Sequence, residues 1–122
     1  MQYEFIVQKI FDSLELFMCF EDKYKILSNI FNISALDYDN KEEWLNSITN
    51  TLEGKLENGD FGVQTGFGAE VEKEKTTIYC DFTDEELEIS TNQFRKISEI
   101  WFDSLEEFKK TGQLKVKDGF IA

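Results

Sequence analysis

The chain has 122 residues, and its 25 acidic against 13 basic side chains give it a formal net charge of -12. This length suits one domain with a single core, and a hydrophobic content of 41% with 12 phenylalanines excludes a disordered acidic tail. The acidic excess argues against a nucleic-acid-binding surface, and the absence of histidine removes the usual general base and the commonest zinc ligand. We therefore expect one domain over residues 1–122 that binds no nucleic acid, is not an enzyme, and needs no cofactor or metal.

Two features of the sequence bear on the compartment. The chain starts without a basic segment ahead of an apolar run, and no apolar run is long enough to cross a membrane, so we expect a cytoplasmic protein without membrane contact. Cys19 and Cys80 lie far apart in apolar surroundings, which favours buried free thiols. A disulfide or a reactive thiol is the alternative.

The first third of the chain has helical periodicity. Apolar residues recur every three or four positions from Val7 to Met18, which predicts a first helix. Acids at positions 21 and 22 open a second periodic stretch that reaches Phe31, and negative charge is favourable at a helix N-terminus. Two consecutive helices are expected here.

A third helix is predicted to begin near Asp39 or Asn40 and to end before Gly54, with Trp44 and Ile48 buried. The segment 37–42 in front of it also resembles the start of a calcium-binding loop, because oxygen ligands occupy its first and third positions. That match fails at the following positions, where a lysine and a glutamate replace an oxygen ligand and the glycine of the turn. Helix capping is the interpretation we prefer.

Glycine and alternating apolar residues dominate positions 54 to 89. Asn58-Gly59 is a hairpin signal, Phe61 and Val63 alternate, and the charged run 72–75 separates two further alternating stretches. The second of these extends to Phe82, and a last strand covers positions 86–89. We expect an antiparallel sheet of about three strands.

The glycine-rich segment 59–68 raises the question of a phosphate-binding loop. A Walker loop requires a lysine after its last glycine, whereas Gly68 is followed by Ala69 and Glu70. The glycines also lie among strand residues and do not open a helix, as a dinucleotide site requires. Bulges or close backbone packing explain them better.

Ser90 and Gln93 form a capping-box pattern, which predicts the start of a long helix. Apolar residues then keep helical spacing up to two lysines, and Gly112 ends the helix. Leu114 and Val116 are predicted to form a short last strand. The chain should therefore be an α+β domain with N-terminal helices, an antiparallel sheet and a long C-terminal helix.

Negative charge is concentrated between residues 81 and 107, where nine acids and two bases give a balance of -7. Exposed faces are normally charged and acidic excess raises solubility, so this pattern has a purely structural explanation. Clustered like charge also destabilises a fold by self-repulsion, which a cationic partner would offset. The acids that we predict to bind such a partner are Asp81, Asp84, Glu85, Glu86, Glu88, Glu99, Asp103 and Glu106.

Several segments between residues 60 and 108 carry a family resemblance. They are Phe61-Gly62-Val63, Thr77-Ile78-Tyr79-Cys80-Asp81-Phe82, and Glu86-Leu87-Glu88-Ile89-Ser90 leading into Gln93-Phe94. Together with an early amphipathic helix, they resemble small bacterial immunity proteins of contact-dependent inhibition and related polymorphic toxin systems, in particular those that neutralise ribonuclease toxins. The resemblance implies a cytoplasmic antitoxin that binds its cognate toxin and blocks the toxin's active site or substrate surface.

Three functional hypotheses follow. The first is an immunity protein whose carboxylates contact a basic nuclease-type toxin, with aromatic anchors chosen from Tyr38, Phe61, Phe67 and Tyr79, each of which is otherwise a core residue. The second is a structural or adaptor subunit that associates through an apolar surface. The third is an enzyme with a carboxylate pair, which would need one carboxylate buried against aromatic rings.

Overall fold

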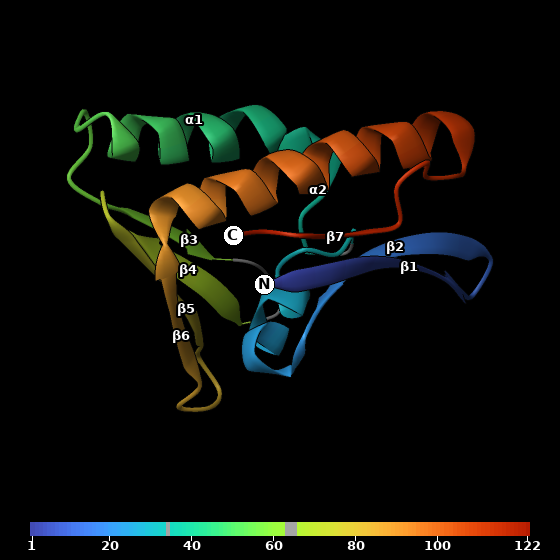
Figure 1. The fold of residues 1–122 in the computed structure, drawn as a ribbon, viewed down its shortest axis with the longest axis horizontal. Helices are drawn as coiled ribbons and strands as arrows, with labels where there is room; N and C mark the ends of the chain where they lie inside the picture. The colour runs from blue at the N-terminus through green and yellow to red at the C-terminus, as the bar shows by residue number, and fades with distance from the viewer. Residues whose placement is uncertain (34, 63–65) are drawn as a thin grey trace.

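The protein is described by a computed structural model that covers residues 1–33, 35–62 and 66–122. Two antiparallel sheets and two long helices make up the fold, and Figure 1 shows α1 and α2 side by side above the sheets. The mixture of helix and antiparallel sheet predicted from the sequence is confirmed. In the described part of the chain, no helix combines the length and the apolar character that crossing a membrane requires.

The first sheet has the strand order β2-β1-β7. Its strands are β1 (Gln2–Ile10), β2 (Ser13–Phe20) and β7 (Asp118–Phe120). β1 and β2 form a hairpin in which Ile10 pairs with Ser13, so that only Phe11 and Asp12 make the turn.

The predicted helix between Val7 and Met18 is therefore wrong. Leu16, Met18 and Phe20 alternate on one strand and are buried, whereas Val7 and Phe11, on which the helical spacing depended, are exposed. The turn contains no glycine, proline or asparagine, so the usual signal for a hairpin is missing from the sequence. The apolar residues of this aromatic-rich segment fit both a strand pattern and a helical pattern, so the pattern alone does not distinguish the two structures. Tertiary packing selects the strand.

The segment after β2 is helical but forms a 3-10 helix, η1 (Asp22–Asn29), in place of the predicted α-helix. A second short 3-10 helix, η2 (Tyr38–Asn40), leads into α1 (Lys41–Leu52). The predicted third helix is confirmed, with Trp44 and Ile48 buried and the positive φ of +80° at Gly54 just beyond its end.

The second sheet has the order β3-β4-β5-β6, one strand more than predicted. Its strands are β3 (Gly59–Gly62), β4 (Phe67–Val71), β5 (Lys75–Cys80) and β6 (Glu86–Ser90). The charged run 72–75 forms the turn between β4 and β5, as expected. The expected alternation stops earlier than predicted, because β5 ends at Cys80 and Phe82 is 80% exposed. Val63 lies outside the described residues.

α2 (Thr91–Thr111) begins and ends as predicted. The Ser90 hydroxyl accepts the Gln93 amide at 3.0 Å, and the Gln93 side chain accepts the Ser90 amide at 2.9 Å, which completes the capping box. Gly112 ends the helix in the left-handed conformation with φ +73°. The predicted strand at Leu114 and Val116 is wrong, because the last strand, β7, starts at Asp118 where backbone pairing with β1 begins.

The core lies between the helices and the inner faces of both sheets. Trp44 packs against Phe61 from β3 with ring centroids 4.7 Å apart, and Trp101 stacks on Phe5 from β1 at 6.4 Å. Both indole N–H groups are satisfied, that of Trp44 by the Ser98 hydroxyl and that of Trp101 by a backbone carbonyl, each at 3.0 Å. The two cysteines are free, with Cys80 buried and Cys19 half-buried.

A cross-strand pair of glycines in the second sheet allows a matched test of packing. Gly62 pairs with Gly68, but a Cβ at Gly68 would lie 2.5 Å from the Tyr79 hydroxyl oxygen and 2.8 Å from a backbone oxygen, whereas a Cβ at Gly62 would meet nothing within 4 Å. We expect Gly68→Ala to lower the free energy of unfolding by about 1–3 kcal/mol because the sheet must shift. Urea unfolding should show Gly62→Ala to be nearly neutral, and equal effects of the two substitutions would contradict this packing.

Candidate functional site

The eight acids predicted to bind a partner fall into two groups. Asp81, Asp84 and Glu85 lie in the loop between β5 and β6, with Glu86 and Glu88 on β6. The remaining three, Glu99, Asp103 and Glu106, lie on α2. Figure 1 shows that the β5–β6 loop is at the end of β6 farthest from α2, so the fold does not join the two groups into one patch.

The outer face of the second sheet carries more carboxylates than the sequence indicated. Pairing across the four strands places Asp60 opposite Glu70, Glu70 opposite Thr77, and Thr77 opposite Glu88. Directly opposed residues share one face of a sheet, and all three carboxylates are exposed. The acidic sheet face is defined here as Asp60, Glu70, Tyr79, Glu86 and Glu88, together with the adjoining loop acids Asp81, Asp84 and Glu85.

Tyr79 stands in the middle of the acidic sheet face. Its hydroxyl donates a 2.7 Å hydrogen bond to Asp60, and its strand partners are Gly68 and Glu86. The hydrogen bond to Asp60, partial burial, and the negative charges of Asp60, Asp81 and Glu70 raise the pKa of Tyr79 to about 12. The raised pKa of Tyr79 thus reflects the negative electrostatic potential of the carboxylates around it.

Basic side chains neutralise the helix acids to a greater extent. Glu99 pairs with Arg95 at 2.9 Å, one helical turn away. Glu106 lies 3.0 Å from Lys110 and 3.7 Å from Lys41. The Lys110 hydrogen bond and charge, with a smaller contribution from Lys41, hold the pKa of Glu106 below its usual value. On the acidic sheet face, the one ion pair among the described residues joins Glu88 to Lys75 at 3.8 Å.

The four aromatic side chains considered as anchors have different surroundings. Phe61 lies inside, against Trp44 and Phe94, and Phe67 packs against the core, so both have the structural role. Tyr38 is exposed on η2, and Tyr79 is half-buried on the acidic sheet face. Phe82 was not among the predicted anchors, but it lies among the loop acids with 80% of its surface exposed.

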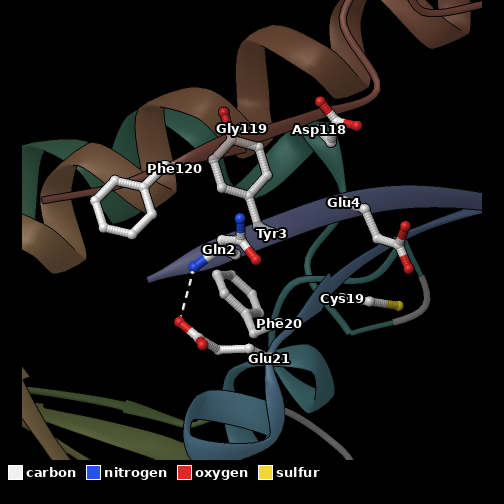
Figure 2. A pocket seen from close by; sticks show the side chains of 9 residues that line it. All are labelled: Gln2, Tyr3, Glu4, Cys19, Phe20, Glu21, Asp118, Gly119 and Phe120. Atoms are coloured by element: carbon white, nitrogen blue, oxygen red, sulfur yellow. Dashed lines mark hydrogen bonds between the residues drawn. The ribbon is translucent and has the colours of Figure 1, made fainter.

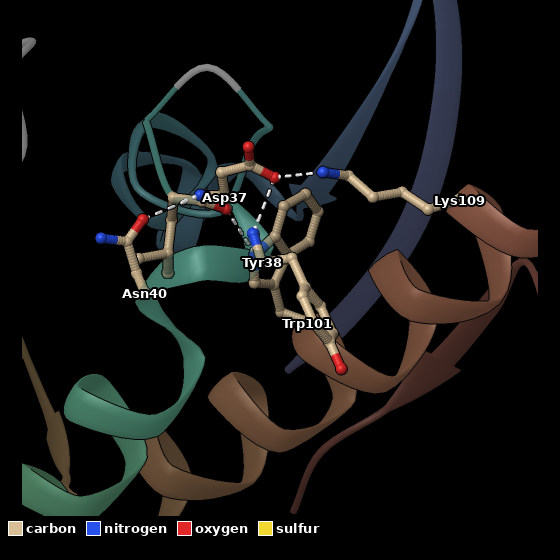
Figure 3. Close-up of polar contacts among 6 residues, drawn as sticks. Asp37, Tyr38, Asn40, Trp101 and Lys109 are labelled. Atoms are coloured by element: carbon tan, nitrogen blue, oxygen red, sulfur yellow. Dashed lines mark hydrogen bonds and ion pairs between the residues drawn. The ribbon is translucent and has the colours of Figure 1, made fainter.

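The segment that resembled a calcium loop caps a helix (Figure 3). The Asp37 carboxylate accepts the Tyr38 amide at 2.7 Å and an ion-pair hydrogen bond from Lys109 at 2.6 Å. Partial burial acts to raise the pKa of Asp37, but the bonds from Lys109 and the Tyr38 amide, with the Lys109 charge, bring that pKa below its usual value. Among the described residues, no group of three or more acids or cysteines is arranged to hold a metal ion.

A groove of about 580 Å³ lies beside the first strands (Figure 2). Glu4, Glu21, Asp118 and Cys19 are among its lining residues, and Glu21 already accepts the Gln2 amide at 2.9 Å. Partial burial and the charge of Glu4 raise the pKa of the Cys19 thiol. The thiol is therefore not activated as a nucleophile, which requires a lowered pKa.

Asp60 and Glu70 belong to the acidic sheet face but were missed from the sequence. Each occupies a polar position in a short alternating stretch, which is the only local signal for an outward side chain. Their placement beside Glu88 depends on the register of three strand pairs, and single-sequence periodicity does not contain that register.

Comparisons with protein-family models, with curated proteins and with solved structures gave no match to this chain.

The titration of Tyr79 tests the electrostatics of the acidic sheet face. A tyrosine whose pKa is raised on folding stabilises the fold fully below its ordinary value of 10.0, and this contribution is lost as the pH rises towards about 12. We expect ultraviolet titration of tyrosinate in the folded protein to show a late step that is absent in Tyr79→Phe.

Asp60→Asn should shift the Tyr79 step towards lower pH, because the substitution removes the carboxylate that makes the largest contribution. Tyr3→Phe is the control, because the pKa of Tyr3 is raised by its own partial burial and by Asp118, which are separate from Asp60. The Tyr79 step should remain in this variant. A late step that is unchanged in Asp60→Asn would show that the acidic sheet face does not act on Tyr79.

Proposed function

We propose that the protein is a cytoplasmic immunity protein, a non-enzymatic inhibitor that binds a basic nuclease-type toxin through its acidic sheet face. The observation that carries the proposal is the row of carboxylates Asp60, Glu70 and Glu88 across neighbouring strands. In the complex, these carboxylates would take the place of the substrate phosphates on the basic surface of the nuclease. A surface of one charge sign also speeds capture of an oppositely charged partner.

Aromatic side chains next to this row can supply binding energy that exposed charges do not. Tyr79 lies on the same sheet face as the row, two residues beyond its β5 member, and Phe82 follows in the β5–β6 loop. Interface hot spots are enriched in tyrosine and other large side chains, whereas exposed charges mainly set the association rate and its salt dependence. We assign Tyr79 and Phe82 the role of anchors and the surrounding acids the role of steering groups.

The decisive experiment uses the protein encoded in the adjacent reading frame, if it ends in a basic nuclease-like domain. Co-expression should give a stable complex and should restore growth of cells that express that domain. Absence of both a complex and growth protection would remove the proposed function.

Charge reversal tests which surface binds. Glu70→Lys and Asp103→Lys each reverse one exposed carboxylate, the first on the acidic sheet face and the second on α2. We expect stopped-flow measurements at low salt to show association with the nuclease domain slowed by roughly tenfold in Glu70→Lys and little changed in Asp103→Lys. If the two variants are slowed equally, the function can stand but the assigned surface is wrong.

One observation favours an adaptor subunit as a second candidate. The end of the β1–β2 hairpin exposes the large apolar side chains Val7, Phe11 and Leu14. Exposed apolar residues that cluster in this way mark association surfaces. Salt separates the two candidates, because acid-steered binding weakens steeply as ionic strength rises and apolar docking does not.

A further inference from the structure

The Tyr79 ring lies flat across the outer face of the second sheet, because its neighbour on β4 is a glycine. A Cβ at Gly68 would lie 2.6 Å from the Cζ atom of Tyr79 and 2.5 Å from its hydroxyl oxygen, so the ring covers the place that a side chain would occupy. Gly68 is accordingly buried, whereas Glu70 on the same face is exposed. One face of the ring therefore rests on the glycine backbone, and the opposite face is directed towards solvent.

A hydrogen bond holds the far end of the ring. The Tyr79 hydroxyl reaches beyond β4 to β3, where it donates to Asp60 at 2.7 Å. The strand backbone fixes one end of the side chain and Asp60 fixes the other. A group that stacks on this ring meets a surface that is already ordered, so little conformational entropy is lost on binding.

Further carboxylates surround the ring. Glu70 follows Gly68 by two residues on β4, Glu86 pairs with Tyr79 from β6, and Asp81 lies two residues further along the chain. All three acids are exposed. The ring thus forms the floor of a shallow site with negative charge at its margins.

The bases of the chain do not fill this site. In the described part of the chain, Lys23 lies over the Tyr24 ring and Lys41 over the Tyr38 ring, with the ammonium nitrogen 5.4 and 5.6 Å from the ring centroid. No such cation lies over Tyr79 among the described residues. The only base of strands β3 to β6 is already engaged in an ion pair near the other end of β5.

The chemistry of this site favours a guanidinium group. A cation is attracted to the face of an aromatic ring. A guanidinium is planar and weakly hydrated, so it can stack on the ring while its N–H groups donate to carboxylates beside it. An ammonium is compact and strongly hydrated, and it gains less from leaving water for the ring.

We propose that the solvent-facing side of Tyr79 binds an arginine side chain of the basic partner, with the guanidinium stacked on the ring and hydrogen-bonded to Glu70 or Glu86. This inference rests on the proposed function, because it names the group through which the sheet face would recognise that partner. A contact made by charge alone is the alternative, and lysine would serve it equally well.

Peptide binding to the full chain tests the choice of arginine. The probes are an arginine–glycine repeat peptide and a lysine–glycine peptide of equal length and charge, each titrated by calorimetry at low salt. We expect the arginine peptide to bind roughly threefold more tightly or better, because stacking adds to the attraction that both peptides share. Equal affinities, or no binding of either peptide, would overturn the proposal.

Variants show whether the ring makes the difference. Tyr79→Phe keeps the ring and should retain the arginine preference. Tyr79→Leu should remove the preference and leave the affinity for the lysine peptide nearly unchanged, since the carboxylates remain. Tyr38→Leu is the matched control, because Tyr38 is an exposed tyrosine whose ring already carries Lys41. A preference that persists in Tyr79→Leu, or is lost equally in Tyr38→Leu, contradicts the assigned site.

Nuclear magnetic resonance of the unaltered protein gives a measurement that does not depend on how the variants fold. Nuclear Overhauser contacts should join the arginine side chains of the bound peptide to the ring protons of Tyr79, and contacts to other residues alone would overturn the proposal. The proposed function fails separately. A nuclease domain that is neutralised without any arginine preference removes this inference alone, whereas an arginine preference without growth protection removes the immunity function alone.

Discussion

The apolar stripe of α2 holds the two sheets in one core. Trp101 stacks on Phe5 from the first sheet, and the ring centroid of Phe94 lies 6.2 Å from that of Phe61 in the second sheet. Burying two tryptophans is favourable only if their N–H groups find acceptors, since an unsatisfied buried donor costs about 1–3 kcal/mol. Ser98 and the Leu36 carbonyl meet that requirement and fix the position of α2 relative to α1 and the segment before η2. Because the helices occupy the inner faces, the outer face of the second sheet is left to solvent.

The parts of the fold that could be predicted from the sequence are those with local signals. The Ser90–Gln93 capping box and Gly112 mark both ends of α2, and their hydrogen bonds lie within a few residues of each other. The N-terminal hairpin carries no such signal, because Phe11 and Asp12 form its turn and its apolar residues also fit a helical stripe. Only the burial of Leu16 and Met18 in the core distinguishes the two, and burial is a long-range property.

The residues of the candidate site also divide into those with a local sequence signal and those without one. Glu86 and Glu88 alternate with Leu87 and Ile89 in the sequence, which indicates an outward strand face, and both acids are exposed. Asp60 and Glu70 join them only through strand register, which alternation along a single sequence does not contain. The predicted helix acids were chosen by charge count and by their helical spacing away from the apolar stripe. The ion pairs of Glu99 with Arg95 and of Glu106 with Lys110 each join residues four apart, so the predicted helix already indicated them.

The two acid groups also differ in what their charge costs the fold. On α2, oppositely charged partners four residues apart give a small gain in stability. On the second sheet, Asp60 and Glu70 face one another directly, and like charges in such pairs are destabilising. The Tyr79 hydroxyl relieves this repulsion in part by donating to Asp60. Solubility alone could be achieved with mixed charges at no such cost, and this asymmetry supports a cationic partner for the sheet face but not for the helix.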